Sequence, residues 1–74
     1  MEVTYDQARE IARELGWEGD MEQFRRGLEV EWEHIDTIKK YAPNANLTLV
    51  AGSIAIDHLN EWPDYYTRLK KVER

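Results

Sequence analysis

The chain of 74 residues contains no cysteine. This absence excludes disulfides, thiolate zinc sites, iron–sulfur clusters and cysteine nucleophiles together. The sequence also lacks any apolar run near the roughly 20 residues that a membrane-spanning helix needs. A single core in a chain of this size supplies only about 3–5 kcal/mol of stability. With disulfides excluded, we therefore expect a bound metal or self-association to support the fold.

Basic residues are scarce relative to acidic ones, with 10 Lys and Arg against 15 Asp and Glu, so that the net charge is −5. Nucleic acids and anionic membranes are bound largely through Lys and Arg. We therefore expect neither as a partner, whereas an acidic chain favours cations. The opening stretch, MEVTYDQARE, is polar and acidic rather than typical of a signal peptide. From this we expect a cytoplasmic location.

Apolar residues recur at helical spacing along most of the chain, which predicts an all-α fold in a single domain, residues 1–74. The two central helices should form an antiparallel hairpin, with a short helix before and after it. Assembly of several copies would complete a bundle, as a homo-oligomer of two or more chains. The expected helices cover residues 4–15, 20–40, 48–62 and 63–73.

Polar residues mark where these helices should begin. Thr4 and Gln7 fit a capping box, and so do Asp20 and Gln23. A connector rich in Pro and Asn, residues 41–46, separates the two long helices, because such residues favour turns. Thr48 is the expected cap of the helix that follows.

Two segments carry the functional signal, GLEVEWEH at residues 27–34 and DHLNEWPDYY at residues 57–66. Each contains a Glu and a His three positions apart, and such a pair shares one face of a helix. The order is reversed between the segments, so an antiparallel pair of helices would place Glu beside Glu and His beside His. The pattern predicts a two-His, two-Glu metal site formed by Glu31, His34, His58 and Glu61.

A metal is expected because carboxylate and imidazole groups on an apolar stripe lose their hydration unless they are paired or bound to a cation. Two neighbouring carboxylates also repel each other, and a divalent cation removes that repulsion. Nitrogen and oxygen donors without thiolate suit a transition metal, and we expect iron or zinc. A structural Glu–His network without metal is the alternative interpretation. The ligands can come from one chain or from two, and the second arrangement would approach a ferritin-like half-bundle.

A second class of function is a metal-free interaction or adaptor module anchored by Trp17, Trp32 or Trp62, since aromatic side chains dominate many interfaces. Enzymatic activity stays open at this point. A metal-free hydrolase is the weakest hypothesis, because Ser53, the only serine, lies in no nucleophile motif. Tyr65 and Tyr66 are expected in the core, with hydrogen bonding to a ligating carboxylate as the alternative.

Two blocks of the sequence resemble a known family: FRRGLEVEWEH at residues 24–34 and IAIDHLNEWPDYYTRLKKVE at residues 54–73. The family comprises small uncharacterised helical proteins from prokaryotes and their viruses. The resemblance covers most of residues 24–73 and little of the first predicted helix. It implies a short helical protein and carries no activity with it.

Overall fold

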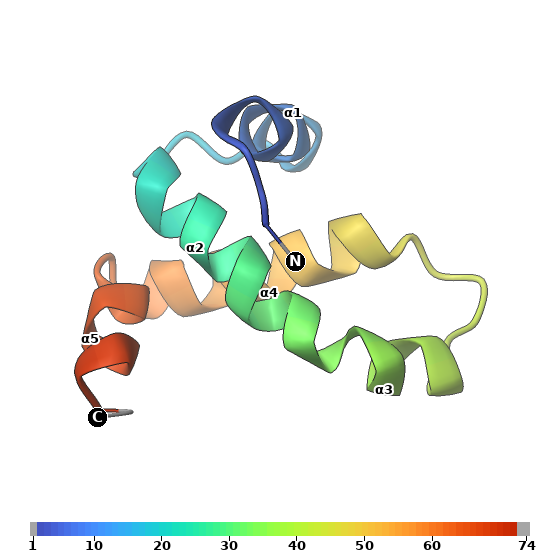
Figure 1. Ribbon diagram of the computed structural model, residues 1–74. Coiled ribbons are helices and arrows are strands. Elements are labelled where there is room, and N and C mark those ends of the chain that lie inside the picture. Colours follow the sequence, from blue (N-terminus) through green and yellow to red (C-terminus); the bar gives the residue numbers. More distant parts are fainter. Residues whose placement is uncertain (1, 73–74) are drawn as a thin grey trace.

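The computed structural model describes residues 2–72, and within them all regular secondary structure is helical, which confirms the all-α prediction. Figure 1 shows α2, a short 3₁₀ turn and α3 following one another along a bent path, with α4 returning behind them as the second arm of the hairpin. In this view α1 lies at the top, above the start of α2, and α5 lies at the lower left, after the end of α4. The elements are α1 (Tyr5–Leu15), α2 (Met21–Glu31), η1 (Trp32–His34), α3 (Ile35–Tyr41), α4 (Leu47–Glu61) and α5 (Tyr65–Val72).

The first two helices begin where their caps predict. Thr4 and Gln7 form a complete capping box at α1. At α2 the Asp20 carboxylate accepts a hydrogen bond from the Gln23 backbone N–H at 3.0 Å, whereas the Gln23 side chain turns away to α5. The predicted cap of the next helix was wrong. Asn46 rather than Thr48 caps α4, accepting from the Leu49 N–H at 3.2 Å.

Two helix boundaries differ from the sequence-based expectation. The helix predicted over residues 20–40 is interrupted at η1, where the 3₁₀ turn has 3.0 residues per turn rather than 3.6. The final helix begins at Tyr65 rather than at residue 63, because Trp62 to Asp64 form the turn after α4. Its predicted end at residue 73 lies outside the described residues.

Small residues allow the helices to approach closely around the core, whose largest fully buried side chains are Phe24 and Leu28. A Cβ atom added at Gly27 would lie 2.6 Å from the Tyr66 ring and 2.9 Å from the Ala55 Cβ. Gly27 therefore permits α2 to pack directly against α4 and α5. Four alanines of α1 and α4 complete this tightly packed interior: Ala8, Ala12, Ala51 and Ala55.

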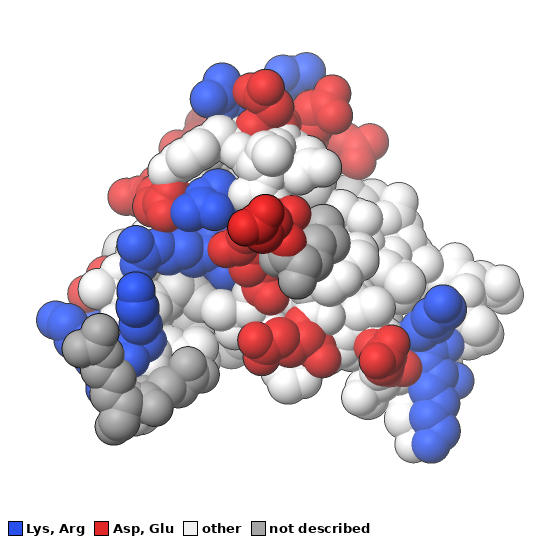
Figure 2. Space-filling model, viewed as in Figure 1, with Lys and Arg blue, Asp and Glu red and all other residues white. Residues whose placement is uncertain are grey.

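The surface has an uneven distribution of charge. In Figure 2 acidic side chains are spread over the top and centre of this face, with basic side chains among them, whereas the two lower ends, over α5 and α3, carry mainly basic groups. The last turns of α3 and α5 each carry two lysines, Lys39 and Lys40 in one and Lys70 and Lys71 in the other. Among residues 2–72, no helix combines the length and apolar character required to cross a membrane.

Candidate functional site at the junction of α2, α4 and α5

Glu31, the last residue of α2, is the only charged residue that is buried among residues 2–72, with 7% of its surface exposed. It occupies a core position in the row that includes Leu28 and Ile35, as the helical spacing predicts. An ionised carboxylate in such a place loses several kcal/mol of hydration unless partners compensate it. The neighbours of Glu31 therefore determine what the site can do.

The first partner is Tyr66 in α5, whose hydroxyl donates a hydrogen bond to Glu31 Oε2 at 2.9 Å. Burial of the ring, followed by its bond to the carboxylate, raises the pKa of Tyr66 well above its usual range. The phenol thus stays protonated and acts as a permanent donor. Tyr66 is both a core residue and a hydrogen-bond partner of Glu31, so it combines the two roles considered from the sequence.

The position of Tyr66 is fixed from α2. The Gln23 side chain donates to Thr67 Oγ1 at 2.7 Å and accepts from the Tyr66 backbone N–H at 3.2 Å, which ties the first turn of α5 to α2. The sequence pattern predicted Gln23 as a capping-box residue and gave no indication of this contact with α5. No local pattern indicates it, because Gln23 and Thr67 are 44 positions apart.

The second partner is His58 in α4, whose Nε2 lies 3.8 Å from Glu31 Oε2. Its ring stacks on Tyr65, with the two ring centres 4.3 Å apart and the planes 3° from parallel. The ring of Tyr66 is nearly perpendicular to that of His58, and the two ring centres are 6.3 Å apart. The imidazole is therefore held in one orientation beside the carboxylate, while 34% of its side chain stays exposed to solvent.

The other two predicted ligands, His34 and Glu61, are exposed. Successive residues of an α-helix are about 100° apart around its axis. His34 is the last residue of the 3₁₀ turn η1, outside the α-helix that carries Glu31, while Glu61 is two residues, or about 200°, from the buried Leu59. The spacing of three residues predicted that the Glu and the His of each segment would share one helix face. Only part of that face is covered by neighbouring helices, and it includes Glu31 and His58 but not His34 and Glu61.

Within residues 2–72, no three His, Cys, Asp or Glu side chains are grouped closely enough to hold a metal ion. The structure thus brings Glu31 and His58 together and does not add His34 or Glu61 to them. One carboxylate oxygen and one imidazole nitrogen can supply two donors to a cation. The remaining donors would have to come from water or from another chain.

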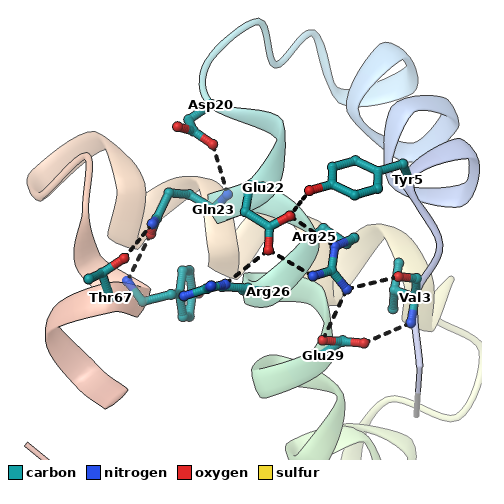
Figure 3. A network of polar contacts seen from close by, with 10 residues as sticks. Val3, Tyr5, Asp20, Glu22, Gln23, Arg25, Arg26, Glu29 and Thr67 are labelled. Carbon is teal, nitrogen blue, oxygen red and sulfur yellow. Dashed lines mark hydrogen bonds and ion pairs between the residues drawn. The ribbon is translucent and has the colours of Figure 1, made fainter. Parts of the chain in front are cut away.

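A separate polar network, which sequence analysis did not identify, surrounds Glu22 in α2 (Figure 3). Its carboxylate accepts from Arg25 at 2.7 Å, from Arg26 at 3.0 Å and from the hydroxyl of Tyr5. The hydrogen bond from Arg25 is the main reason that the pKa of Glu22 is lowered. The spacing of Glu22 to both arginines, three and four residues, is the signal that could have identified it.

The same network fastens the N-terminal segment to α2. Arg25 donates to the carbonyl of Val3 at 3.3 Å, and Glu29 accepts from the Val3 backbone N–H at 2.9 Å. Glu29 also lies 3.5 Å from the Arg25 guanidinium. These carboxylates are thus engaged by arginine and backbone groups, and their arrangement is that of a structural network.

Fold and site together define a class: a small all-α protein in which a buried carboxylate lies beside an imidazole that packs against two tyrosine rings. The chain belongs to the family of proteins of unknown function DUF5661, whose model matches residues 4–74. This agrees with the expected membership in an uncharacterised helical family. No curated protein and no solved structure matches the chain.

Proposed function

We propose that this protein binds a divalent transition metal, iron or zinc, through Glu31 and His58. The observation that carries the proposal is the buried carboxylate of Glu31, which among residues 2–72 accepts one hydrogen bond, from a neutral hydroxyl, and has an imidazole beside it. The proposed site keeps two members of the predicted set, Glu31 and His58, and omits the other two, His34 and Glu61.

The separation of the two donor atoms supports this assignment. At 3.8 Å, His58 Nε2 is beyond the roughly 2.7–3.2 Å of an N–H···O hydrogen bond to Glu31 Oε2. Two donors about 2.1 Å from a tetrahedral ion lie about 3.4 Å apart. The two atoms would have to approach by about 0.4 Å, from 3.8 Å, to reach that distance. The hydroxyl of Tyr66 would then orient the carboxylate, as outer hydrogen-bond partners do at metal sites.

Two protein donors leave coordination positions for other ligands. The exposed His34 and Glu61 of a second copy can fill them, or water can, and the first arrangement would make the protein a homo-oligomer. The proposal places the protein in the cytoplasm. An ion with open positions polarises bound water or substrate, which is the chemistry that would make the protein an enzyme.

A protonated His58 paired with Glu31 is the competing account of the same contacts. In that account the pair stabilises the fold without binding a cation, and the metal-free interaction module becomes the leading function. The two accounts differ in what the protein retains when it is purified without chelating resin.

Native mass spectrometry with elemental analysis on untagged protein tests the proposal, before and after anaerobic exposure to Fe²⁺ and Zn²⁺. We expect a metal in the unmodified protein, lost in His58→Ala. His34→Ala is the informative companion because His34 is exposed and its replacement leaves the core intact. Retention of metal by His34→Ala assigns the open positions to water, and loss of both metal and oligomer assigns them to a second copy. An unmodified protein that stays metal-free after both exposures contradicts the proposal.

A further inference from the structure

One face of α5 and the turn before it is apolar and open to solvent. Trp62, Tyr65, Leu69 and Val72 follow one another at spacings of three and four residues, which places them along one side of the helix. Trp62 is 47% exposed and Val72 is 80% exposed. Together with two basic neighbours these side chains form a groove of about 500 Å³, lined by Trp62, Tyr65, Arg68, Leu69, Lys71 and Val72.

The wall of this groove is held in place before any partner arrives. The guanidinium of Arg68 lies 4.3 Å from the centre of the Trp62 ring, a cation–π contact. Arg68 is fixed in turn by Asp64, to which its Nε donates at 2.7 Å. A side chain that is already immobilised loses little conformational entropy on binding. Trp62 is therefore a pre-oriented anchor, whereas Trp17 and Trp32 are partly buried against the core.

Charge around the groove differs from that of the whole chain. Residues 62–72 contain three basic side chains and one acidic side chain, although the protein has a net charge of −5. Among residues 2–72, Lys70 and Lys71 form no ion pair, whereas Arg68 is paired with Asp64. The basic group over α5 is visible at the lower left of Figure 2.

We propose that the groove on α5 docks an acidic segment of a partner protein that presents apolar side chains at helical spacing. The apolar floor takes the partner's anchor residues, as in helix-in-groove recognition. Lys71 and Arg68, the basic residues that line the groove, attract its carboxylates, which gives both orientation and discrimination.

Charge also argues against two other possible occupants of the groove, a second copy of the chain and an anionic membrane. Two copies that met symmetrically through this face would bring their Arg68 and Lys71 side chains together, and these like charges repel. A homo-oligomer formed for metal binding would therefore use another face. An anionic membrane meets a protein whose overall charge is negative, and a concave groove accommodates a side chain better than it penetrates a bilayer.

The docking proposal does not rest on metal binding, although the two sites share Tyr65, which lines the groove and stacks on His58. All binding experiments are therefore done with a chelator present. Failure of docking then leaves the metal proposal untouched, and the reverse also holds.

The test uses ¹⁵N-labelled protein and a short acetylated and amidated peptide with leucines at i, i+3, i+4 and i+7 and glutamate elsewhere. A matched peptide carries lysine in place of glutamate. We expect the acidic peptide to shift the Trp62 indole resonance and those of Leu69 and Val72, with an affinity at least about tenfold above that of the basic peptide. Added salt should reduce the difference, because it screens exposed charges.

Val72→Asp and Lys71→Glu are expected to weaken binding of the acidic peptide at least about tenfold and severalfold, respectively. Both residues are exposed, so these variants are expected to fold. Tyr41→Asp is the matched control, because Tyr41 is a similarly exposed apolar residue at 76% on the distant helix α3. It should bind the peptide like the unmodified protein.

Three results would overturn the proposal. One is equal affinity for the acidic and basic peptides, or resonance shifts that map away from α5. Another is a concentration-dependent shift of Trp62 in the protein alone, with a matching dimer in sedimentation, which would make a second copy the occupant. The last is binding to vesicles of phosphatidylcholine and phosphatidylglycerol through Trp62 without binding to the acidic peptide.

Discussion

Two of the three carboxylates of helix α2 have opposite surroundings, Glu22 in its first turn and Glu31 at its end. Glu22 is a third exposed at its side chain and is bound by two arginines and a tyrosine hydroxyl. Glu31 has 9% of its side chain exposed, with one tyrosine hydroxyl and one imidazole beside it. The more accessible carboxylate thus has the stronger cationic partners.

This difference separates a structural network from a candidate binding site. The charge of Glu22 is already balanced by fixed cations, and little would be gained if a metal replaced them. Glu31 instead accepts a hydrogen bond from the neutral hydroxyl of Tyr66, and beside it lies the imidazole of His58, which is itself a common metal ligand. A buried anion with an incomplete set of partners is where a cation from outside is most stabilising.

The largest expected effect comes from removing one tyrosine hydroxyl at each carboxylate. In metal-free protein, Tyr66→Phe should reduce the free energy of unfolding by about 1–3 kcal/mol, because Glu31 stays buried without its donor. Tyr5→Phe should change it by less than about 0.5 kcal/mol, since Glu22 keeps both arginines and lies near solvent. Urea denaturation of the two variants measures the difference. Equal losses would mean that the two carboxylates are not distinct.

A smaller effect is expected when the packing behind Tyr66 is disturbed. Gly27→Ala gains about 1 kcal/mol in helix propensity but forces a Cβ against Tyr66 and Ala55, at a cost of about 1–3 kcal/mol. We expect a net loss of about 1 kcal/mol together with a shifted Tyr66 resonance.

Gly52→Ala is the matched control, because the added Cβ would meet mainly the flexible end of Leu15, at 2.7 Å. Its thermal and urea stability should be unchanged or slightly higher. If Gly27→Ala proves as stable as Gly52→Ala, close packing at Gly27 does not position Tyr66.

The smallest effect concerns acid. Because the pKa of Glu22 is lowered in the folded protein, its stabilising contribution is present above the unfolded value near 4.5 and is lost as pH falls below it. Glu22→Gln removes this contribution, so unmodified protein should exceed the variant by less than about 1 kcal/mol at pH 7. Urea denaturation from pH 7 to pH 3 should show this gap closing. A gap that widens on acidification would contradict the assignment.

Most of the fold follows from local patterns in the sequence. Thr4, Gln7 and Asp20 act as predicted because a helix start depends on residues three positions apart. The cap of α4 was misplaced because Asn46 and Thr48 are both good caps, and only the packing of the helix selects between them. The break at η1 was missed for the opposite reason, since no Pro or Gly marks residues 32–34.

The site was predictable only in part. Glu31 was predictable because it interrupts an apolar stripe, and a buried polar residue is informative wherever it occurs. His58 and Glu61 were both expected on the buried side of α4, and only His58 lies beside Glu31. His34 and Glu61 share the spacing without sharing the burial, which depends on how far α4 covers the face of α2. Tyr66 meets Glu31 across 35 positions of sequence, a contact that tertiary packing alone creates.

The central claim is that Glu31 binds a cation and Glu22 does not. Its most direct test is a zinc titration at pH 7 in competition with a chromophoric chelator, on unmodified protein, Glu31→Gln and Glu22→Gln. We predict at least about a tenfold loss of zinc affinity for Glu31→Gln, because losing even an outer partner of a metal ligand costs about 10–100-fold. Glu22→Gln should stay within about twofold of unmodified protein, since its carboxylate is engaged by arginines. Equal affinities in all three proteins, or no competition by any of them, would contradict the account.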